Sequence, residues 1–413
     1  MSTPALARPL VRLALSAVLL SVLLPGVAAG ADWPQYRGPA RDGRSAETGL
    51  LAAWPMAGPQ VLWRAPLGDG YSGMAVAGGR VYTVFGAGRD EIVIAFDAAT
   101  GKEVWRQRLD GYRSDDMGGG PRSTPTVAGG LLYALSSSGR LAALDAATGE
   151  GKWEVDLVAA YGARIPQWGV SISPLVEGDL LLLDVGGKPG HSLVALNKTT
   201  GKLAWAAESG SPGYSAPLAV TAQGVRQVLF FTGAGLVSVD PAVGKPLWRF
   251  PWKTDYDVNA AMPVFLPPDR VFISSSYGTG AALLRIEKQG SGLAVQEVWR
   301  SKVMKNHFNS SVLVGDHLYG FDDGTLKCIV AATGEEKWRQ RGFNKGSLLY
   351  ADGRLLVLSE QGVLALVEAS PEAYRETGRM TVFTARTWTM PSLADGRLFV
   401  RSGAELVALK VSR

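Results

Sequence analysis

The feature that most restricts the fold is a ten-residue pattern that recurs along most of the chain. It consists of an apolar residue, an Asp or Asn, a Gly four positions later and a Trp four positions after the Gly. Copies occupy residues 96–105, 144–153, 196–205 and 239–248, and a copy without the acid occupies residues 330–338. The short polar side chain favours a turn, and Gly accepts the positive φ of a tight reversal. Each copy therefore predicts a β-hairpin whose Trp packs on a neighbouring unit, and such recurrence indicates a repeat architecture.

A second pattern marks where each repeat begins. A small residue and a Pro precede two apolar strands that are separated by a Gly turn, most clearly in residues 123–133. Aligned on the Pro, the unit starts are Met74, Pro125, Pro174, Pro217, Pro263, Ser311, Leu348 and Pro391. Units of about 37 to 51 residues have room for four short strands, which is typical of a propeller blade. We therefore predict an all-β fold, an eight-bladed β-propeller of four-stranded antiparallel blades over residues 61–413.

The Trp residues of the repeat indicate how the ring closes. They are Trp63, Trp105, Trp153, Trp205, Trp248, Trp299 and Trp338, with Met380 in the eighth place. The last unit stops after its third strand, at residues 405–409, whereas Trp63 lies in a strand that no hairpin precedes. We therefore expect the N-terminal strand to complete the last blade, which removes open sheet edges. The Trp residues are interpreted as structural, because truncating a buried Trp costs about 3–5 kcal/mol.

The first 31 residues have the properties of a secretory signal peptide. They lack Asp and Glu, and Arg8 and Arg12 precede an apolar run at 13–24 and a stretch of small residues. An apolar run of this length is too short to span a bilayer comfortably. We therefore expect cleavage near Asp32 and an exported protein, periplasmic or secreted, that is soluble and without a membrane span after cleavage.

Charge and cysteine content exclude several classes of function. Loss of the two arginines of the signal peptide lowers the formal net charge from +5 to +3, which gives no support for nucleic-acid binding. Cys328 is the only cysteine, so no internal disulfide can form. With three scattered histidines beside one cysteine, no metal site is predicted. A monomer is expected.

Residues 32–60 lie before the ring and are rich in Pro and Gly without a sustained period. Trp33, Tyr36 and Trp54 would anchor this segment on a preformed surface. We therefore predict an N-terminal arm packed on the propeller rather than a frayed leader, since a frayed segment would leave three large aromatic side chains exposed.

The repeat patterns resemble the pyrroloquinoline-quinone-type (PQQ-type) propeller repeat over residues 61–413. One branch of this family comprises the quinoprotein alcohol dehydrogenases, which hold the quinone and a Ca²⁺ ion on the ring axis. Another branch is not enzymatic and is typified by the periplasmic scaffold lipoprotein of the outer-membrane β-barrel assembly machine. The opening at 33–43, with its Trp-Pro and Arg-Gly-Pro motifs, is also similar to that of exported repeat proteins without an assigned activity.

The sequence departs from both branches. The dehydrogenases place a vicinal disulfide against the quinone, which a chain with Cys328 alone cannot form, and a Cys-x-x-Cys-His haem motif is absent. The assembly scaffold carries its lipid on a Cys that this chain lacks. Because one fold hosts several functions, the site must be sought where the repeats differ from one another.

The repeats differ most on the face where the connections into the inner strands converge around the channel mouth. Three residues before the unit starts stand Tyr71, Arg122, Ser171, Tyr214, Ala260, Phe308, Lys345 and Trp388. The longest departures from the repeat, at 165–169, 252–259, 305–309 and 386–388, fall there too. The candidate ligand-binding residues are Arg122, Trp168, Tyr214, Asp257, Asn259, Lys305, His307, Asn309, Lys345 and Trp388. The aromatic residues could plug the axis or stack on a ligand, and the cations could form a solvated rim or hold carboxylates.

Two functions are compatible with this mouth. The first, which we favour, is a non-catalytic binding or scaffold protein of the periplasm that binds a protein or another envelope ligand and needs no cofactor. The second is a degenerate quinoprotein dehydrogenase with the quinone and Ca²⁺ at the same mouth. As the resemblance implies, Arg122, Lys305 and Lys345 would then meet the carboxylates of the quinone. Trp168 or Trp388 would stack on its ring, and Asp257 would be the base.

Overall fold

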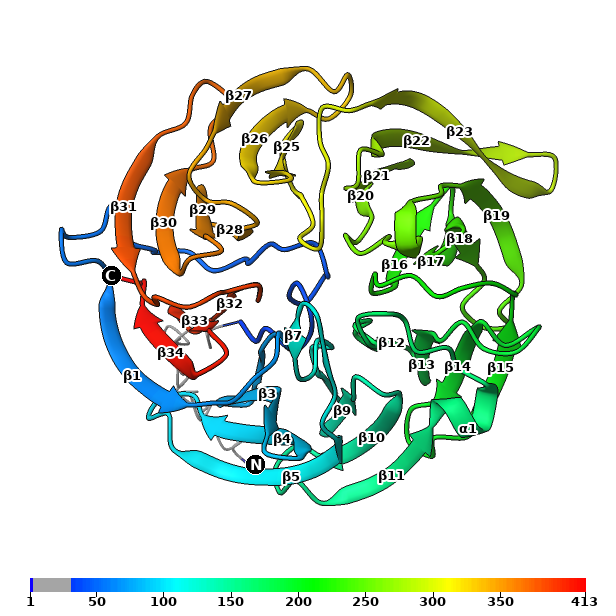
Figure 1. The fold of residues 1–413 in the computed structure, drawn as a ribbon, viewed down its shortest axis with the longest axis horizontal. Coiled ribbons are helices and arrows are strands. Elements are labelled where there is room, and N and C mark those ends of the chain that lie inside the picture. Colours follow the sequence, from blue (N-terminus) through cyan, green and yellow to red (C-terminus); the bar gives the residue numbers. More distant parts are fainter. Residues whose placement is uncertain (3–30) are drawn as a thin grey trace.

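The computed structural model describes residues 1–2 and 31–413, and the latter form a ring of eight four-stranded antiparallel sheets (Figure 1). The chain passes once around the ring and lays down its blades in sequence order. The predicted eight-bladed propeller is therefore confirmed. Most of the predicted signal peptide, residues 3–30, lies outside the described residues.

The first four blades contain the strands that follow the N-terminal strand β1. Blade 1 is β2 (Ala75–Ala77), β3 (Arg80–Ala87), β4 (Asp90–Asp97) and β5 (Glu103–Gly111). Blade 2 is β8 (Thr126–Ala128), β9 (Leu131–Leu135), β10 (Arg140–Asp145) and β11 (Gly151–Asp156). Blade 3 is β12 (Leu175–Glu177), β13 (Leu180–Asp184), β14 (Leu193–Asn197) and β15 (Leu203–Ala207). Blade 4 is β16 (Leu218–Ala222), β17 (Val225–Thr232), β18 (Gly235–Val239) and β19 (Pro246–Pro251).

The remaining blades follow the same order. Blade 5 is β20 (Val264–Leu266), β21 (Arg270–Ser275), β22 (Gly280–Gln289) and β23 (Gly292–Ser301). Blade 6 is β24 (Val312–Val314), β25 (His317–Asp322), β26 (Thr325–Val330) and β27 (Glu336–Gln340). Blade 7 is β28 (Ser347–Ala351), β29 (Arg354–Leu358), β30 (Val363–Glu368) and β31 (Glu376–Thr381). Blade 8 is β32 (Ser392–Ala394), β33 (Arg397–Arg401), β34 (Glu405–Lys410) and β1 (Gln60–Pro66).

Three short elements lie between the blades. They are the hairpin β6 (Ser114–Asp115) and β7 (Gly118–Gly119), the helix α1 (Leu157–Tyr161) and the 3₁₀ turn η1 (Asp255–Asp257). The hairpin and the 3₁₀ turn lie on the side of the ring where the repeats differ most.

The ring closes through the pairing of β1 with β34. These strands run antiparallel, and Trp63 lies opposite Ala408 beside a β-bulge. The prediction that an N-terminal strand completes the last blade is therefore confirmed. Closure pairs the outer edge of β34, which would otherwise present free N–H and C=O groups.

The Trp and Gly residues of the repeat meet across the blade interfaces. The ring of Trp63 packs on Gly101 of the next blade, and its Nε1 donates a hydrogen bond to the carbonyl oxygen of Ala98 at 3.1 Å. Corresponding bonds of 2.9–3.2 Å are made by Trp105, Trp153, Trp205, Trp299 and Trp338 to carbonyl oxygens of the following blades. The repeat therefore encodes both the turn within one blade and the contact with the blade before it.

Two positions depart from this arrangement. Trp248 donates instead to Oε1 of Gln227 in its own blade, because the next blade has the long β22–β23 hairpin in place of the Asp-x-x-x-Gly turn. Met380, in the eighth place of the series, lies against Gly58 of the arm.

The N-terminal arm crosses one end of the central channel. Trp33 pairs with Val76 of blade 1, and the carbonyl oxygen of Gly43 accepts a hydrogen bond from Tyr350 of blade 7 at 2.9 Å. Two of the predicted anchors, Trp33 and Trp54, are 1% and 7% exposed. The third, Tyr36, is partly buried and packs against the hydrophobic core.

Two buried arginines fasten the arm to the starts of blades 3 and 6. Arg41 donates to the carbonyl oxygens of Ser173 and Pro174 at 2.8 and 2.9 Å. Arg37 donates to those of Ser310 and Ser311 at 3.1 and 2.8 Å. Burial lowers the pKa of Arg41 to about 9, which leaves it charged near neutral pH. Hydrogen bonds from charged groups to buried carbonyls are among the stronger polar contacts in proteins.

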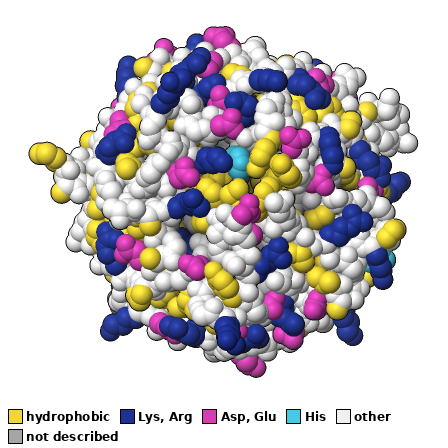
Figure 2. Space-filling view, in the orientation of Figure 1, with side chains coloured by type: hydrophobic (Ala, Val, Ile, Leu, Met, Phe, Trp, Pro, Cys, Tyr) yellow, Lys and Arg dark blue, Asp and Glu magenta, His cyan; other side chains and the backbone are white. Residues whose placement is uncertain are grey.

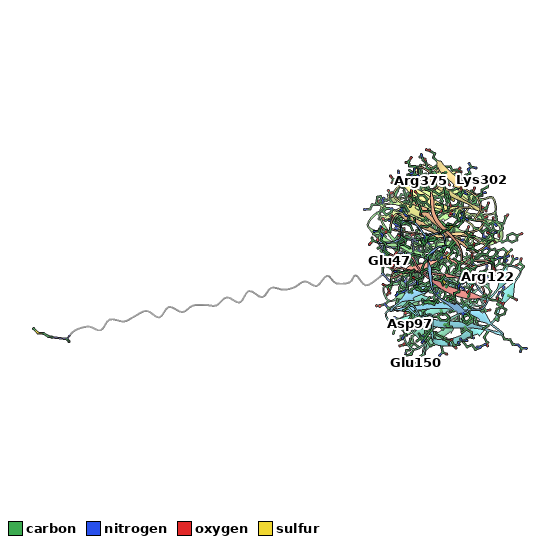
Figure 3. The ribbon with its side chains drawn as sticks, turned by 90° about the vertical axis from the view of Figure 1, so that its left-hand side faces the viewer. Glu47, Asp97, Arg122, Glu150, Lys302 and Arg375 are labelled. Carbon is green, nitrogen blue, oxygen red and sulfur yellow. The ribbon has the colours of Figure 1, made fainter. Side chains whose placement is uncertain are left out.

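The arm and the candidate site lie on opposite faces of the disc. Glu47 of the arm accepts hydrogen bonds from the backbone of Asp395 and Gly396 in the β32–β33 turn. In the side view, Glu47 and Asp97 lie toward one face and Arg122 toward the other (Figure 3). The mouth around Arg122 is therefore not covered by the arm.

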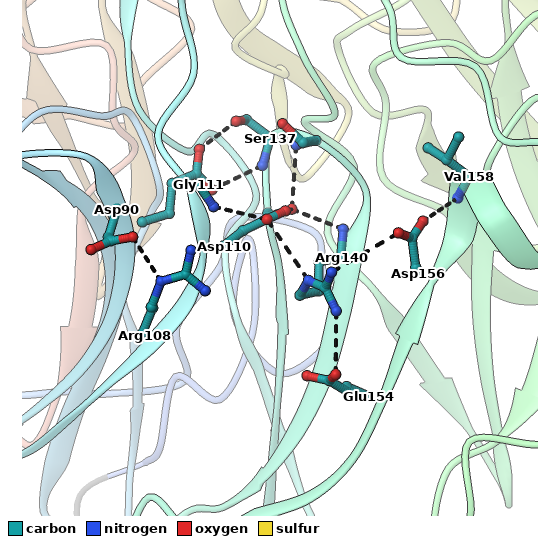
Figure 4. A network of polar contacts seen from close by, with 12 residues as sticks. Asp90, Arg108, Asp110, Gly111, Ser137, Arg140, Glu154, Asp156 and Val158 are labelled. Atoms are coloured by element: carbon teal, nitrogen blue, oxygen red, sulfur yellow. Dashed lines mark hydrogen bonds and ion pairs between the residues drawn. The ribbon is translucent and has the colours of Figure 1, made fainter.

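Polar contacts supplement the apolar interface between blades 1 and 2 (Figure 4). Asp110 at the end of β5 accepts a hydrogen bond from the hydroxyl of Ser136 at 2.7 Å. Its carboxylate also lies 3.7 Å from Nε of Arg140 in β10, and Arg140 reaches Glu154 at 3.3 Å. Because these side chains are partly exposed, their ion pairs contribute little to the stability of the fold. We infer that they serve mainly to align the two blades.

We predict that Gly149→Ala destabilises the ring more than Gly129→Ala does. Both glycines have positive φ, 77° and 59°, so each substitution has the backbone cost of about 1–2 kcal/mol. Only at Gly149 would the new Cβ lie 2.6 Å from the ring of Trp105, whereas Gly129 has nothing within 4 Å. Overpacking should add about 1–3 kcal/mol at Gly149. Urea unfolding measures the difference, and equal losses would contradict the proposed Trp–Gly contact.

Candidate binding site at the mouth of the ring

A cavity of about 180 Å³ opens on the ring axis at the face opposite the arm. Its lining contains all eight residues that precede the unit starts, so each blade contributes to it. These are Tyr71, Arg122, Ser171, Tyr214, Ala260, Phe308, Lys345 and Trp388. Tyr36 of the arm also lines the cavity and forms its floor. Because the blades radiate from the axis, equivalent positions in the repeat converge on one point in space.

Aromatic side chains form a nearly continuous arc around this mouth. Seen from this face, hydrophobic side chains and a histidine gather at the centre of the ring (Figure 2). The neighbouring ring centroids are 5.2–6.0 Å apart. In order, the arc contains Tyr214, Trp168, Tyr256, Tyr277, His307, Phe308, Trp388 and Tyr71. Such edge-to-face and tilted contacts hold the rings in defined orientations.

Two carboxylates orient the indoles of the arc. The Nε1 of Trp168 donates to Asp116 at 2.9 Å, and that of Trp388 donates to Glu360 at 2.9 Å. Both bonds point the N–H toward the rim and leave the ring surfaces for packing at the mouth. The indoles are therefore fixed before any ligand arrives, which lowers the entropic cost of binding.

Two tyrosines of the arc have backbone conformations that bulky residues rarely adopt. Tyr256 and Tyr277 have φ of 59° and 55°, and 66% and 37% of their surface is exposed. Residues in this conformation cost of order 1–3 kcal/mol and gather at ligand-binding segments. Large exposed rings held in this way are a feature of binding surfaces more than of plugs.

The cations of the mouth differ in their partners. Arg122 pairs with Asp115 of the β6–β7 hairpin at 2.9 Å and lies over the ring of Tyr71. Arg386 lies over the ring of Trp388, 4.3 Å from its centroid. Among the described residues, Lys345 has no carboxylate within ion-pair distance, and its Nζ is 3.4 Å from Nε2 of His307.

His307 is held neutral by its surroundings. Burial and the nearby charge of Lys345 lower its pKa to about 4. Because an ammonium group can only donate, Nε2 accepts from Lys345 and the ring proton lies on Nδ1. The Nδ1 atom is buried and has no hydrogen-bond partner among the described residues.

Seven of the ten candidate residues line the cavity, and three lie outside it. The seven are Arg122, Trp168, Tyr214, His307, Asn309, Lys345 and Trp388. Asp257 forms an ion pair with Lys253, and Lys305 is held by Asp322 and Asp323 at 2.9 and 2.8 Å.

Asn259, the third residue outside, has a structural role. Its amide donates to the carbonyl oxygens of Thr232 and Trp252 and accepts from Ser275, and the residue is fully buried. It therefore fixes the loop between blades 4 and 5 rather than facing a ligand.

Sequence reasoning missed several residues of the mouth. Tyr277 lies in the turn between β21 and β22, the second turn of its blade, and the position of that turn in the repeat is a signal that could have identified it. Met117 and Asp116 lie in the insertion that forms the β6–β7 hairpin. Tyr36 reaches the floor from the arm, which has no repeat register, so the sequence pattern carried no signal for it.

The described residues do not fit the metal-quinone pair of the dehydrogenase branch. The lining of the cavity contains no Asp or Glu among these residues, and they include no group of three or more His, Cys, Asp and Glu able to hold a metal. A Ca²⁺ ion takes six to eight oxygen ligands. Asp257, the expected base of the dehydrogenase alternative, lies outside the cavity and is paired with Lys253. Cys328 lies buried in β26, where burial raises its pKa to about 11.

A buried carboxyl group supports the loop that carries Tyr214. Asp184, at the end of β13, is 2% exposed and accepts a hydrogen bond from the backbone N–H of Gly213 at 3.0 Å. Its other oxygen has no partner among the described residues. Burial raises the pKa of Asp184 to about 7.

These features define a class, the eight-bladed propellers of PQQ-type repeats with one open, aromatic-lined mouth. The profile of the family described as outer membrane protein assembly factor BamB matches residues 47–212, 89–340 and 293–371. Because these matches cover most of the chain, the chain belongs to this family. In residues 1–2 and 31–413, no helix has the length and apolar character needed to cross a membrane.

Individual relatives come from both branches. The chain is 28% identical over 343 residues to outer membrane protein assembly factor BamB of Burkholderia pseudomallei, covering 69% of this chain and 84% of that protein. It is 26% identical over 303 residues to the quinoprotein alcohol dehydrogenase PedH of Pseudomonas putida, covering 61% of this chain but 45% of that protein. The predicted resemblance to both branches is confirmed.

The fold is shared with a solved structure. The crystal structure of BamB from Moraxella catarrhalis aligns with a TM-score of 0.62 at 19% identity, covering 85% of this chain and 99% of that chain. At this identity the likeness supports the propeller fold.

We predict that Asp184→Asn removes part of the pH dependence of stability. Because the pKa of Asp184 in the folded protein is about 7, against an ordinary value of 3.8, the folded protein retains a proton that the unfolded chain releases. The free energy of unfolding should therefore fall as pH rises from about 4 to about 7. Urea unfolding across this range should show a flatter profile in the variant. Asp179→Asn, an exposed aspartate of the same blade, is the control, and an unchanged profile in Asp184→Asn would contradict the assignment.

Proposed function

We propose that this chain is a non-catalytic scaffold of the bacterial periplasm that binds a protein partner through the mouth of the ring. The observation that carries the proposal is the aromatic arc, which continues from the lining of the cavity onto the exposed ring of Tyr256. Fixed, partly exposed aromatic rings are the side chains that most often dominate the energy of a protein interface.

The family supports a protein as partner. The relative from Burkholderia pseudomallei is named an outer membrane protein assembly factor, and we extend to this chain a partner among the proteins of the cell envelope. The predicted signal peptide supports export of the chain, as a partner in the cell envelope requires. The arm favours one-sided binding, since it occupies the opposite end of the channel.

The mouth has the composition of an interface rather than of a reaction centre. His307 is neutral and bonded to a cation, Asp257 is paired with Lys253, and the described lining has no carboxylate. We therefore assign no proton-transfer step to these residues, and a quinone-dependent oxidation is not our preferred function.

The test of this proposal is photo-crosslinking from the mouth in living cells. A photoreactive phenylalanine at Tyr256 should crosslink one envelope protein, whereas the same group at Val243, which is 61% exposed in the β18–β19 turn, should not. The purified partner should then bind the Trp168→Ala, Tyr256→Ala double variant at least about tenfold more weakly than the wild type. Val243→Ala is the matched control for a lost exposed apolar side chain. Equal crosslinking at both positions, or unchanged affinity of the double variant, would refute mouth binding.

A second prediction concerns the dehydrogenase alternative. Calorimetric titration of the protein from Asp32 with pyrroloquinoline quinone should give no saturable heat, with or without Ca²⁺, because the lining of the described mouth offers the metal no carboxylate ligand. One-to-one binding that requires Ca²⁺ and is lost in Lys345→Ala would overturn the scaffold proposal in favour of a quinoprotein.

A further inference from the structure

We propose that the cavity anchors the partner through an acidic side chain that stands next to an aromatic side chain in the same peptide segment. This inference rests on the proposed function, because it names the chemistry of the partner at the same mouth. It goes further by assigning Lys345 as the residue that receives the carboxylate and the rings around Trp388 as the surface that receives the aromatic side chain.

The charge of the mouth is not balanced within the described residues. Arg122 and Lys305 each have a carboxylate within 3 Å, whereas Lys345 has only His307 as a polar partner. Trp388 lies beneath it, with Nζ 5.9 Å from the ring centroid. An ammonium group in a partly closed, aromatic site without a counter-ion favours an anionic ligand.

His307 lies beside Lys345 and lines the same cavity. Its side chain shares the cavity with Lys345 and contacts Tyr277 and Phe308, with Asp323 the nearest carboxylate to influence it. Asn309, which is 8% exposed, uses its amide N–H group on the carbonyl oxygen of Gly346 and thereby fixes the loop that carries Lys345. The backbone that carries Lys345 is therefore held in place, and this restricts where its ammonium group can lie.

The size and lining of the cavity suit one ring. A cavity of about 150 Å³ is enough for a benzene molecule, and the present cavity of about 180 Å³ is lined by Tyr71, Phe308 and Trp388 beside Lys345. The centroids of Tyr71 and Phe308 lie 5.3 and 5.2 Å from that of Trp388, so the three rings form one apolar wall. An aromatic side chain inserted there would bury its surface while an adjacent carboxylate met Lys345.

The surroundings of the cavity favour a peptide over a free small molecule. Met117, Tyr256 and Tyr277 extend the apolar surface outward from the opening and are 38%, 66% and 37% exposed. Of these three, Tyr256 is not part of the cavity lining, so a ligand that filled the cavity alone would leave it uncovered. A peptide segment that inserts two side chains would cover Tyr256 with its flanks, which matches the anatomy of an interface with a buried centre and a polar rim.

The experiment uses three capped peptides and the histidine resonances of the protein. The chain has three histidines, so the imidazole signal of His307 can be assigned by its loss in His307→Gln. The probes are acetylated, amidated hexapeptides that present Glu-Phe, Gln-Phe or Glu-Ala between Gly-Ser flanks. Phenylacetate serves as the free anionic ring.

We expect the Glu-Phe peptide to shift the His307 signal in a saturable manner and to bind at least about tenfold more tightly than the Gln-Phe or Glu-Ala peptide. Lys345→Gln should abolish the preference for Glu-Phe over Gln-Phe. Lys305→Gln should retain it, since Lys305 lies near the same rim but is held by Asp322 and Asp323 outside the cavity. Phenylacetate should bind more weakly than the Glu-Phe peptide.

Three outcomes would overturn the inference. They are equal binding of Glu-Phe and Gln-Phe, equal effects of the two lysine variants, and tighter binding of phenylacetate than of the peptide, which would assign the cavity to a small molecule. The crosslinked partner separates this inference from the proposed function. If Lys345→Gln binds that partner normally while the Trp168→Ala, Tyr256→Ala variant does not, the mouth is the docking surface and the acidic anchor is wrong.

Discussion

The structure depends on the contact between a Trp in one blade and a Gly in the hairpin of the next. Trp105 fills the space that a side chain at Gly149 would need, and its N–H donates to the backbone of the same hairpin at 3.1 Å. The contact is apolar, directional and repeated, so most of the interfaces share one geometry, and those of Trp248 and Met380 depart from it. A chain without internal disulfides can in this way hold a ring of thin sheets together, because the blades pack on each other over their whole faces.

The arm adds a contact that the repeat does not contain. Its buried guanidinium groups, Arg37 and Arg41, donate to backbone carbonyls of two blades, 6 and 3, that are not neighbours in the ring. Since the acceptors are backbone atoms, the attachment of the arm depends on where the inner strands lie and not on their side chains. The result is a channel with a floor, in which Tyr36 faces the site, and with a single open end.

The mouth is built by varying the residue at one equivalent position of the eight blades. Most charges that gather there are neutralised locally, as Arg122 is by Asp115, and carboxylates outside the cavity hold the indoles of Trp168 and Trp388. What is left facing the opening is a set of oriented aromatic rings and the ammonium group of Lys345. This combination accounts for both proposals, since the rings supply area and the ammonium group of Lys345, which has no carboxylate partner among the described residues, supplies selectivity.

The sequence by itself determined the eight blades, the closure by the strand of Trp63 and the register that converges on the mouth, because those features follow from local turn chemistry repeated at a regular interval. Only the tertiary structure decided which candidates face the cavity. Asn259 and Lys305 are close in sequence to residues of the site. The side chain of Asn259 is hydrogen-bonded to backbone carbonyls, and that of Lys305 is ion-paired with two aspartates, so neither faces the cavity. Tyr36 came from a segment outside the repeat. Hydrogen-bond and charge partners are chosen across blades far apart in sequence, so no local pattern could have revealed them.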